Sequence, residues 1–285
     1  MSLPVRRDGE GFSDSLSIDF ADPESGTAAL VLVELRVDAG RARTVEIVLN
    51  GDVATVDDSE LDADVPSDWD SIELGDLRVS DDGERAAVSL SGEAGELELE
   101  ATRVAGVTLE AGSPFADATG QLHEAFAVQV TGELRTPAGD ARRIDQLGRL
   151  VRTSGAPDWA RIELIRSLTG VLDDGSLLVM ASARPRGAAG HAEEAASAVL
   201  LDSEGALTSF EEPLLSTEYD ASGAHRRAGL ELWAAEEDTA PLRGAGTLVG
   251  PSASDFGQLK TAFLRFTLDG APGTARYDID TRPAE

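Results

Sequence analysis

Hydrophobic and polar residues alternate with a period of two along most of this chain. In residues 96–102 the apolar side chains Leu97, Leu99 and Ala101 fall on one face, and glutamates occupy the other face. This alternation is typical of a β-strand with one buried and one solvated face. It recurs in residues 44–51 and 126–134. Roughly 15 or more such segments can be counted, which predicts a protein built mainly of β-strands.

Turn-forming pairs separate these segments. Asn50-Gly51, Asp82-Gly83, Asp174-Gly175 and Asp269-Gly270 each stand between two alternating runs, as in β-hairpins. Hairpins joined in series predict antiparallel sheets, and the number of strands is too large for one small barrel. We therefore expect an all-β fold with two antiparallel β-barrel or β-sandwich domains in tandem.

Two apolar runs and two ambiguous segments depart from this pattern. Residues 28–35 and 176–183 are apolar on both faces, so we expect them where two sheets or barrels press together. Residues 157–168 and 191–199 fit a short helix as well as a strand or loop, because a proline or early acidic residues favour a helix start.

A change of pattern at residues 110–121 indicates a domain boundary. We expect an N-terminal β-domain over residues 1–118 and a C-terminal β-domain over residues 119–285. Residues 33–51 and residues 132–148 both read as strand, glycine-containing turn and strand, which is consistent with a duplicated β-unit.

Composition excludes several classes of partner. The formal net charge is −29, with 53 acidic residues against 24 basic ones, so clusters of cations that could neutralise phosphates are not expected. We predict no binding to nucleic acid and none to anionic membranes. The chain has no cysteine, which excludes disulfides and thiolate zinc sites. With no apolar run long enough for a signal or a membrane span, we expect a cytoplasmic protein.

Motifs for metals and cofactors are weak. His191 with Glu193 and Glu194 lacks a second histidine at ligand spacing, so a solvated surface is the better interpretation. The acidic residues 57–70 lack the glycine that an EF-hand loop needs, which favours a solvated loop over a calcium site. Residues 243–250 depart from the phosphate-binding glycine pattern. We expect neither a metal nor a cofactor, and no catalytic residue can be named from motifs.

Several segments in order resemble a known family. "SLSIDFADPESGTAALVLVELR", "FAVQVTGELRTPAGDARRID", "GVLDDGSLLVMASARPRG", "TEYDASGAHRRAGLEL" and "LDGAPGTARYDIDTR" are similar to segments of the two-domain lipocalin-like (calycin-like) family of AttH-type and carotenoid hydratase-like proteins, in a diverged bacterial branch. The resemblance implies that both β-domains are lipocalin-like. It also implies a functional segment between the second and third of these stretches, "GRLVRTSGAPDW" in this chain.

That segment keeps some family positions and changes others. Gly148, Gly155, Asp158 and Trp159 match, whereas Val151, Arg152 and Ser154 stand where relatives carry an acid, a histidine and a tryptophan. Since arginine stays charged near neutral pH, it cannot exchange protons as a histidine does. From this resemblance we expect Arg152, Thr153, Ser154 and Trp159 to bind a ligand at the mouth of a barrel, with Arg152 facing an anionic head group.

Two functions follow as hypotheses. The sequence favours a binding protein for an apolar or amphipathic small molecule, because the changed segment offers no titratable group. The alternative is a hydratase, lyase or isomerase acting on a hydrophobic, isoprenoid-like substrate. The oligomeric state cannot be read from the sequence.

Overall fold

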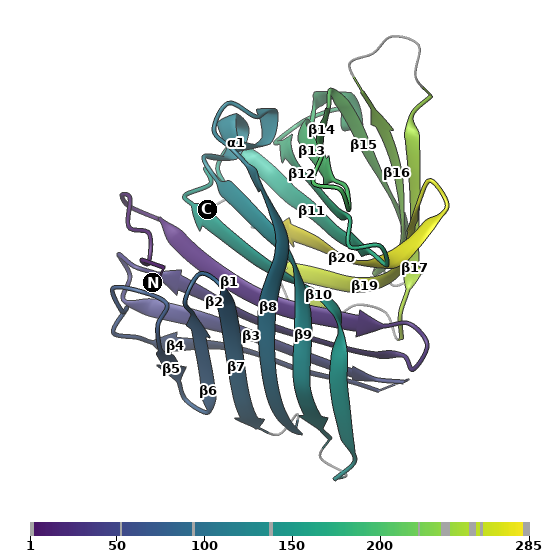
Figure 1. Ribbon diagram of the computed structural model, residues 1–285. Coiled ribbons are helices and arrows are strands. Elements are labelled where there is room, and N and C mark those ends of the chain that lie inside the picture. The colour runs from purple at the N-terminus through teal and green to yellow at the C-terminus, as the bar shows by residue number, and fades with distance from the viewer. Residues whose placement is uncertain are drawn as a thin grey trace.

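The computed structural model describes residues 3–51, 53–92, 95–136, 139–221, 223–234, 240–250, 255–256 and 259–281. Strands dominate this part of the chain, and they form two antiparallel, nearly closed, barrel-like sheets in tandem (Figure 1). The predicted fold class is therefore confirmed. Among the described residues, no helix has the length and apolar character needed to span a membrane.

The first sheet has the order β4-β3-β2-β1-β10-β9-β8-β7-β6-β5. Its strands are β1 (Ser13–Asp22), β2 (Thr27–Arg36), β3 (Arg41–Asn50), β4 (Val53–Asp62), β5 (Ile72–Leu74), β6 (Leu77–Asp81), β7 (Arg85–Gly92), β8 (Gly95–Leu109), β9 (Leu122–Arg135) and β10 (Ala141–Gly155). In β7, buried and exposed residues alternate along most of the strand, as the polar-apolar pattern predicts.

The second sheet has the order β14-β13-β12-β11-β20-β19-β17-β16-β15, and β18 pairs with β19. Its strands are β11 (Ile162–Leu172), β12 (Leu177–Pro185), β13 (Ala195–Leu201), β14 (Leu207–Phe210), β15 (Glu212–Tyr219), β16 (His225–Trp233), β17 (Leu242–Leu248), β18 (Asp255–Phe256), β19 (Leu259–Leu268) and β20 (Ala271–Thr281). Figure 1 shows this sheet above the first, with β1 and β10 near β11 and β20.

The core has two compartments inside the sheets and two between them. One face of β2 packs inside the first sheet through Val31 and Val33, and its other face packs through Leu30 against Phe263 of the second sheet. On β12, Met180 lies inside the second sheet, while Val179 packs in the cluster between the sheets. The prediction that residues 28–35 and 176–183 lie where two sheets meet is confirmed.

The ambiguous segments are mostly strand. Of residues 157–168, those from Ile162 onward form β11, and of residues 191–199, only His191–Glu193 forms a turn of 3₁₀-helix, η1, before β13. The one α-helix of the described chain is α1 (Pro114–Thr119), which sequence reasoning treated as a boundary. Its start carries a recognisable signal, because Ser113 caps it and Pro114 occupies its first turn.

The chain passes from one sheet to the other between Gly155 and Ile162. β9 and β10 follow residue 118 and belong to the first sheet, and the two similar hairpins, β2-β3 and β9-β10, both lie in that sheet. Membership of a strand in one sheet or the other does not by itself test the predicted boundary between domains at residue 118. That boundary stays a prediction. The helix α1 at that point packs against β12 and β13 of the second sheet.

Candidate active site between the two sheets

The alternation of β10 separates the predicted ligand-binding residues. Leu150 lies in the core of the first barrel, and Arg152 and Ser154 share its face of the strand. Val151 packs in the core between the sheets, and Thr153 shares that face. Since successive side chains of a strand point to opposite faces, Arg152 and Thr153 serve different compartments.

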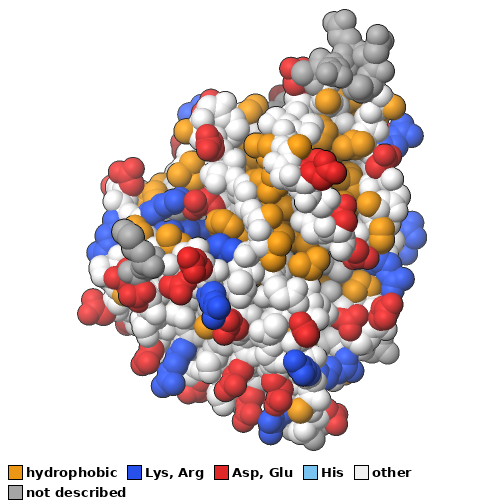
Figure 2. Space-filling model, in the orientation of Figure 1, with side chains coloured by type: hydrophobic (Ala, Val, Ile, Leu, Met, Phe, Trp, Pro, Cys, Tyr) orange, Lys and Arg blue, Asp and Glu red, His pale blue; other side chains and the backbone are white. Residues whose placement is uncertain are grey.

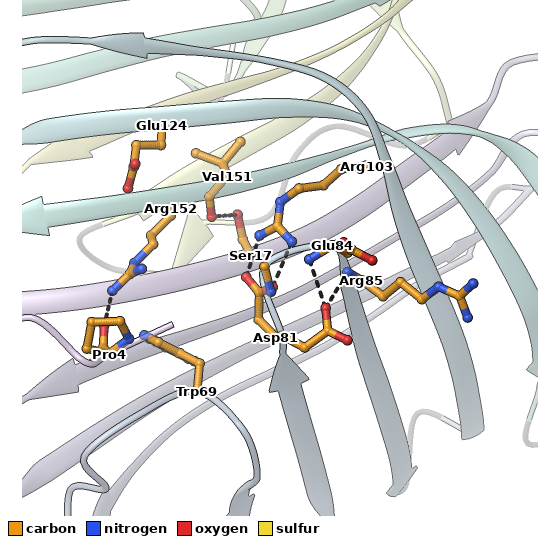
Figure 3. A network of polar contacts seen from close by, with 12 residues as sticks. Pro4, Ser17, Trp69, Asp81, Glu84, Arg85, Arg103, Glu124, Val151 and Arg152 are labelled. Carbon is orange, nitrogen blue, oxygen red and sulfur yellow. Dashed lines mark hydrogen bonds and ion pairs between the residues drawn. The ribbon is translucent and has the colours of Figure 1, made fainter. Parts of the chain in front are cut away.

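Arg152 is buried and paired inside the first barrel. Its Nε donates to Oδ1 of Asp14 at 3.0 Å, and its Nη2 donates to Oδ2 of Asp14 and to the carbonyl of Pro4, both at 2.6 Å. Figure 3 shows Arg152 pointing toward Pro4, with Trp69 beside it. Asp14 also accepts from the indole Nε1 of Trp69 at 3.2 Å. Arg152 thus binds the chain near its start through Pro4, and Asp14, its ion-pair partner, holds Trp69.

Ser154 and Trp159 also have structural partners. Ser154 Oγ accepts a hydrogen bond of 2.8 Å from Nη1 of Arg6. Trp159 packs against the apolar cluster between the sheets, and its carbonyl accepts from Nε of Arg186 at 2.9 Å. The structure therefore brings Arg152 and Ser154 together on one face and places Thr153 and Trp159 elsewhere. Ligand binding by these four residues stays a prediction.

Thr153 lines a cavity of about 120 Å³ between the sheets. The first sheet and α1 contribute serines, acidic and basic side chains and a histidine, and the second sheet contributes a hydroxyl, charged residues and two apolar side chains. The lining residues are Ser13, Ser15, Ser17, Leu32, Glu34, Arg43, Phe115, Gln121, His123, Val151, Thr153, Ile165, Ser167, Leu259, Arg276, Asp278 and Asp280. Val151, at the position where relatives carry an acid, faces this cavity.

His123 supplies a titratable group to this cavity, which residues 148–159 line only with Val151 and Thr153. It lies on β9 directly opposite Thr153 on β10, and its Nδ1 is 3.2 Å from Oγ1 of Thr153. The residue is 4% exposed, and Nε2 has no hydrogen-bond partner among the described atoms. Burial, with a smaller contribution from Arg276, lowers the pKa of His123 to about 4. The imidazole is therefore neutral near pH 7.

Arg276 fixes the opposite wall of the cavity. Its Nη1 donates to Ser17 Oγ at 2.9 Å and to Asp19 Oδ2 at 2.8 Å, and its Nε donates to Asp278 Oδ2 at 2.9 Å. Asp278 in turn accepts from Thr261 Oγ1 at 2.8 Å. Ser17 also reaches the carbonyl of Val151 at 3.4 Å, as Figure 3 shows. These bonds join β1 and β10 to β20, so both sheets build the site.

Sequence reasoning named no role for His123. The one indication of a role was the position of His123 in the sequence. It lies at the start of a strand that pairs with the segment carrying the family resemblance. Only the pairing of β9 with β10 puts the two side by side. Metal ligands were not expected, and in the described part of the chain no cluster of three or more His, Cys, Asp or Glu side chains is arranged to hold a metal ion.

His191 and the acidic segment differ partly from their sequence interpretation. His191 is half exposed, but Glu194 is buried at 3% exposure and binds Arg166 and Arg184. In the acidic segment, residues 53–62 form β4 with mainly exposed side chains, whereas Trp69 is fully buried in the first barrel.

Known structures share this architecture. Kievitone hydratase from Nectria haematococca superposes with a TM-score of 0.70 at 10% identity, over 95% of this chain and 89% of that chain. CghA with Sch210972 gives a TM-score of 0.66 at 12% identity, over 96% and 89% of the two chains. At these identities the likeness establishes the fold. Among curated proteins, none matches the sequence significantly.

A family model covers nearly the whole sequence, in keeping with a fold that needs both sheets. The match extends over residues 4–282 and therefore includes every strand of both sheets. The chain belongs to the family described as a domain of unknown function, DUF7064.

Proposed function

We propose that this protein is an enzyme of the hydratase, lyase or isomerase type that acts on a hydrophobic small molecule at the cavity between the sheets. The observation that carries the proposal is His123, a buried neutral imidazole with an unpartnered Nε2 in a cavity lined by hydroxyl groups. The resemblance to carotenoid hydratase-like proteins and the shared fold with a hydratase support the same class.

A neutral imidazole can accept one proton at Nε2 and return it as an imidazolium. In a dehydration, Nε2 takes a proton from the carbon next to the carbinol, the carbon-carbon double bond forms, and the hydroxyl leaves with the proton that the imidazolium returns. The products are an alkene and water, and hydration is the reverse. The contact with Thr153 orients the ring, as second-layer hydrogen bonds do for catalytic histidines.

The lining also indicates the substrate class. Serines and charged residues form part of the cavity wall. The apolar part is formed by Leu32, Phe115, Val151, Ile165 and Leu259. A water molecule occupies about 30 Å³ in the liquid, so a cavity of about 120 Å³ holds the reacting end of a substrate and one water. The remainder of the molecule would extend outward along the junction of the sheets.

The sequence favours non-catalytic binding because the changed positions Val151, Arg152 and Ser154 offer no group that exchanges protons near neutral pH. The strand next to these positions provides one at His123, which supports the enzymatic alternative. Arg152 gives no support to an anionic head group at this cavity, because its side chain points into the first barrel, where it binds Asp14 and the carbonyl of Pro4.

The test is a search for water addition or loss. The full chain would be incubated in D₂O with a panel of hydrophobic alkenes and tertiary or allylic alcohols, and products followed by mass spectrometry for a gain or loss of water and for deuterium incorporation. For a substrate that reacts, we expect His123→Asn to lower kcat by roughly 10²–10⁴-fold. Thr153→Val should lower kcat less, and Thr153→Ser should restore it.

Gln129→Asn is the matched control, since Gln129 lies on the same strand, outside the cavity, and bonds Asp145. It should keep full activity. Unchanged kcat in a folded His123→Asn variant would contradict the proposal, as would the absence of any reaction across the panel.

A further inference from the structure

A second and larger cavity opens in the second barrel, away from His123. Its volume is about 960 Å³, within the range of about 300–1,000 Å³ typical of small-molecule sites. The two cavities lie on opposite faces of β11, because Ile165 and Ser167 line the first whereas Arg166 lines the second. Ligand binding in the second cavity is therefore independent of the chemistry proposed at His123.

The walls of this cavity are largely apolar. Four strands contribute apolar side chains to them. The side chains are Met180 of β12, Ala196 of β13, Pro213, Leu214 and Leu215 of β15, and Leu230 of β16. Leu214 is 46% exposed. Figure 2 shows hydrophobic side chains gathered in a hollow over the strands of the second sheet. A hollow of this kind favours a ligand with a hydrocarbon body.

Arg166, His191 and Glu194 line the cavity together, and Arg184, which is not part of the lining, binds Glu194 from behind it. The buried carboxylate of Glu194 accepts from Arg166 Nη2, and from Arg184 Nε at 2.9 Å and Nη2 at 2.6 Å. His191 Nδ1 is 3.0 Å from Glu194 Oε1. Burial alone would raise the pKa of Glu194, but the two guanidinium groups hold it below its ordinary value. One carboxylate against two arginines leaves a net positive charge beside the apolar walls.

Arg166 has donor capacity left over. It is 3% exposed, and its Nη1 donates to the carbonyl of Leu215 at 2.9 Å, while its Nε has no hydrogen-bond partner among the described atoms. An unsatisfied, buried cationic donor at the wall of a cavity is costly unless a ligand can use it. The rest of the lining carries Glu211, Glu212 and Glu231 against Arg243, which pairs with Glu231.

We propose that the second barrel binds an amphipathic carboxylate, with its hydrocarbon tail along Met180, Ala196 and Leu230 and its carboxylate at Arg166, the buried lining cation whose Nε has no partner among the described atoms. A carboxylate matches guanidinium donors in charge and geometry. The apolar walls bury the tail, which contributes free energy in proportion to the area removed from water.

The experiment is calorimetric titration of the full chain with dodecanoate, and with dodecanol as the uncharged analogue of equal length. We expect one dodecanoate per chain, bound at least tenfold more tightly than dodecanol. Arg184→Gln should weaken dodecanoate about tenfold and leave dodecanol unchanged, because it removes the positive charge that offsets Glu194 beside Arg166 and removes no apolar wall. Arg184 is partly exposed, so this variant disturbs the fold less than a change at Arg166.

Ala196→Phe should fill part of the cavity and weaken both ligands at least tenfold. Ala87→Phe is its matched control, because Ala87 is exposed on β7 of the first sheet, and it should bind both ligands as the parent does. His123→Asn should also bind normally, which separates this proposal from the one at the other cavity. No dodecanoate binding by the folded parent, equal loss in both phenylalanine variants, or dodecanol binding as tightly as dodecanoate would each overturn the proposal.

Discussion

His123 and Glu46 are buried ionisable residues whose pKa values are displaced toward their neutral forms. Burial lowers the pKa of His123 to about 4 and raises that of Glu46 to about 7, with Asp57 and Asp76 adding to the shift of Glu46. Glu46 lies on β3 directly opposite Asp57 on β4, and like charges in this position repel. Both side chains are neutral in the folded protein. Because histidine is neutral above its pKa and glutamate below its pKa, the two residues make the free energy of unfolding depend on pH in opposite directions.

His123 should make the folded protein less stable at acidic pH. Between the ordinary histidine pKa of about 6.5 and the folded value of about 4, the unfolded chain binds a proton that the folded chain does not. Stability should therefore fall as pH drops through this window, by up to about 3 kcal/mol from this residue. Urea unfolding of the parent and of His123→Asn at pH 7 and 4.5 should show a smaller loss in the variant. Equal losses would indicate an ordinary pKa.

Glu46 should act in the opposite direction. Its raised pKa means that the folded state holds a proton that the unfolded chain releases, so stability falls as pH rises from about 4.5 to 7. We expect Glu46→Gln to increase the free energy of unfolding at pH 8 by about 1–3 kcal/mol and to have little effect at pH 4. Thermal unfolding at both pH values measures this. A variant less stable than the parent at pH 8 would contradict it.

At the scale of elements, strand pairing decides where each side chain acts. β10 sends Arg152 into the first barrel and Thr153 to the junction, and pairing with β9 brings His123 to Thr153. The pairing of β8 with β9 also needs a close backbone approach. A Cβ built on Gly132, whose φ is +152°, would lie 1.9 Å from the carbonyl oxygen of Glu98.

Gly132→Ala should therefore destabilise the protein by about 2–4 kcal/mol, because it combines an unfavourable φ with a clash against the neighbouring strand. Gly190→Ala is the control, since Gly190 has extended backbone and open space around its Cβ position. It should change stability by less than about 1 kcal/mol. The measurement is the denaturant midpoint of unfolding for both variants. Similar midpoints for Gly132→Ala and Gly190→Ala would contradict the close approach of the β8 backbone to Gly132.

At the scale of the whole molecule, a buried ion cluster ties the sheets together. Asp19 on β1 binds Arg149 of β10, with Nε at 2.7 Å, and Arg276 of β20, with Nη1 at 2.8 Å. Arg149 Nη1 also donates to Thr274 Oγ1 at 2.9 Å. Asp19 and Arg149 are fully buried, so removing the shared carboxylate would leave two cations without it.

Asp19→Asn should thus lower the free energy of unfolding by about 3–5 kcal/mol. Glu60→Gln, which removes exposed pairs with Arg36 and Arg41 within the first sheet, should lower it by less than about 1 kcal/mol. Urea titrations followed by far-ultraviolet circular dichroism compare the two. An Asp19→Asn variant as stable as Glu60→Gln would show that the cluster does not join the sheets.

The sequence by itself determined the class of fold. Alternation with period two, as in residues 96–102, and glycine-containing turns are local signals, because side-chain direction in a strand depends only on position along it. Runs apolar on both faces, residues 28–35 and 176–183, revealed the contact between sheets for the same reason. Composition fixed the charge of the surface and the absence of thiol chemistry.

Tertiary structure alone decided which side chains meet at the candidate site. His123 and Thr153 are 30 residues apart, and Ser17 and Arg276 are 259 apart, so no local pattern joins them. The pairing of Arg152 with Asp14, 138 residues away, is likewise a long-range contact. The pKa of a histidine and the partner of an arginine depend on burial and on which strands pair, and both are set by long-range contacts that the alternation of a single strand does not specify.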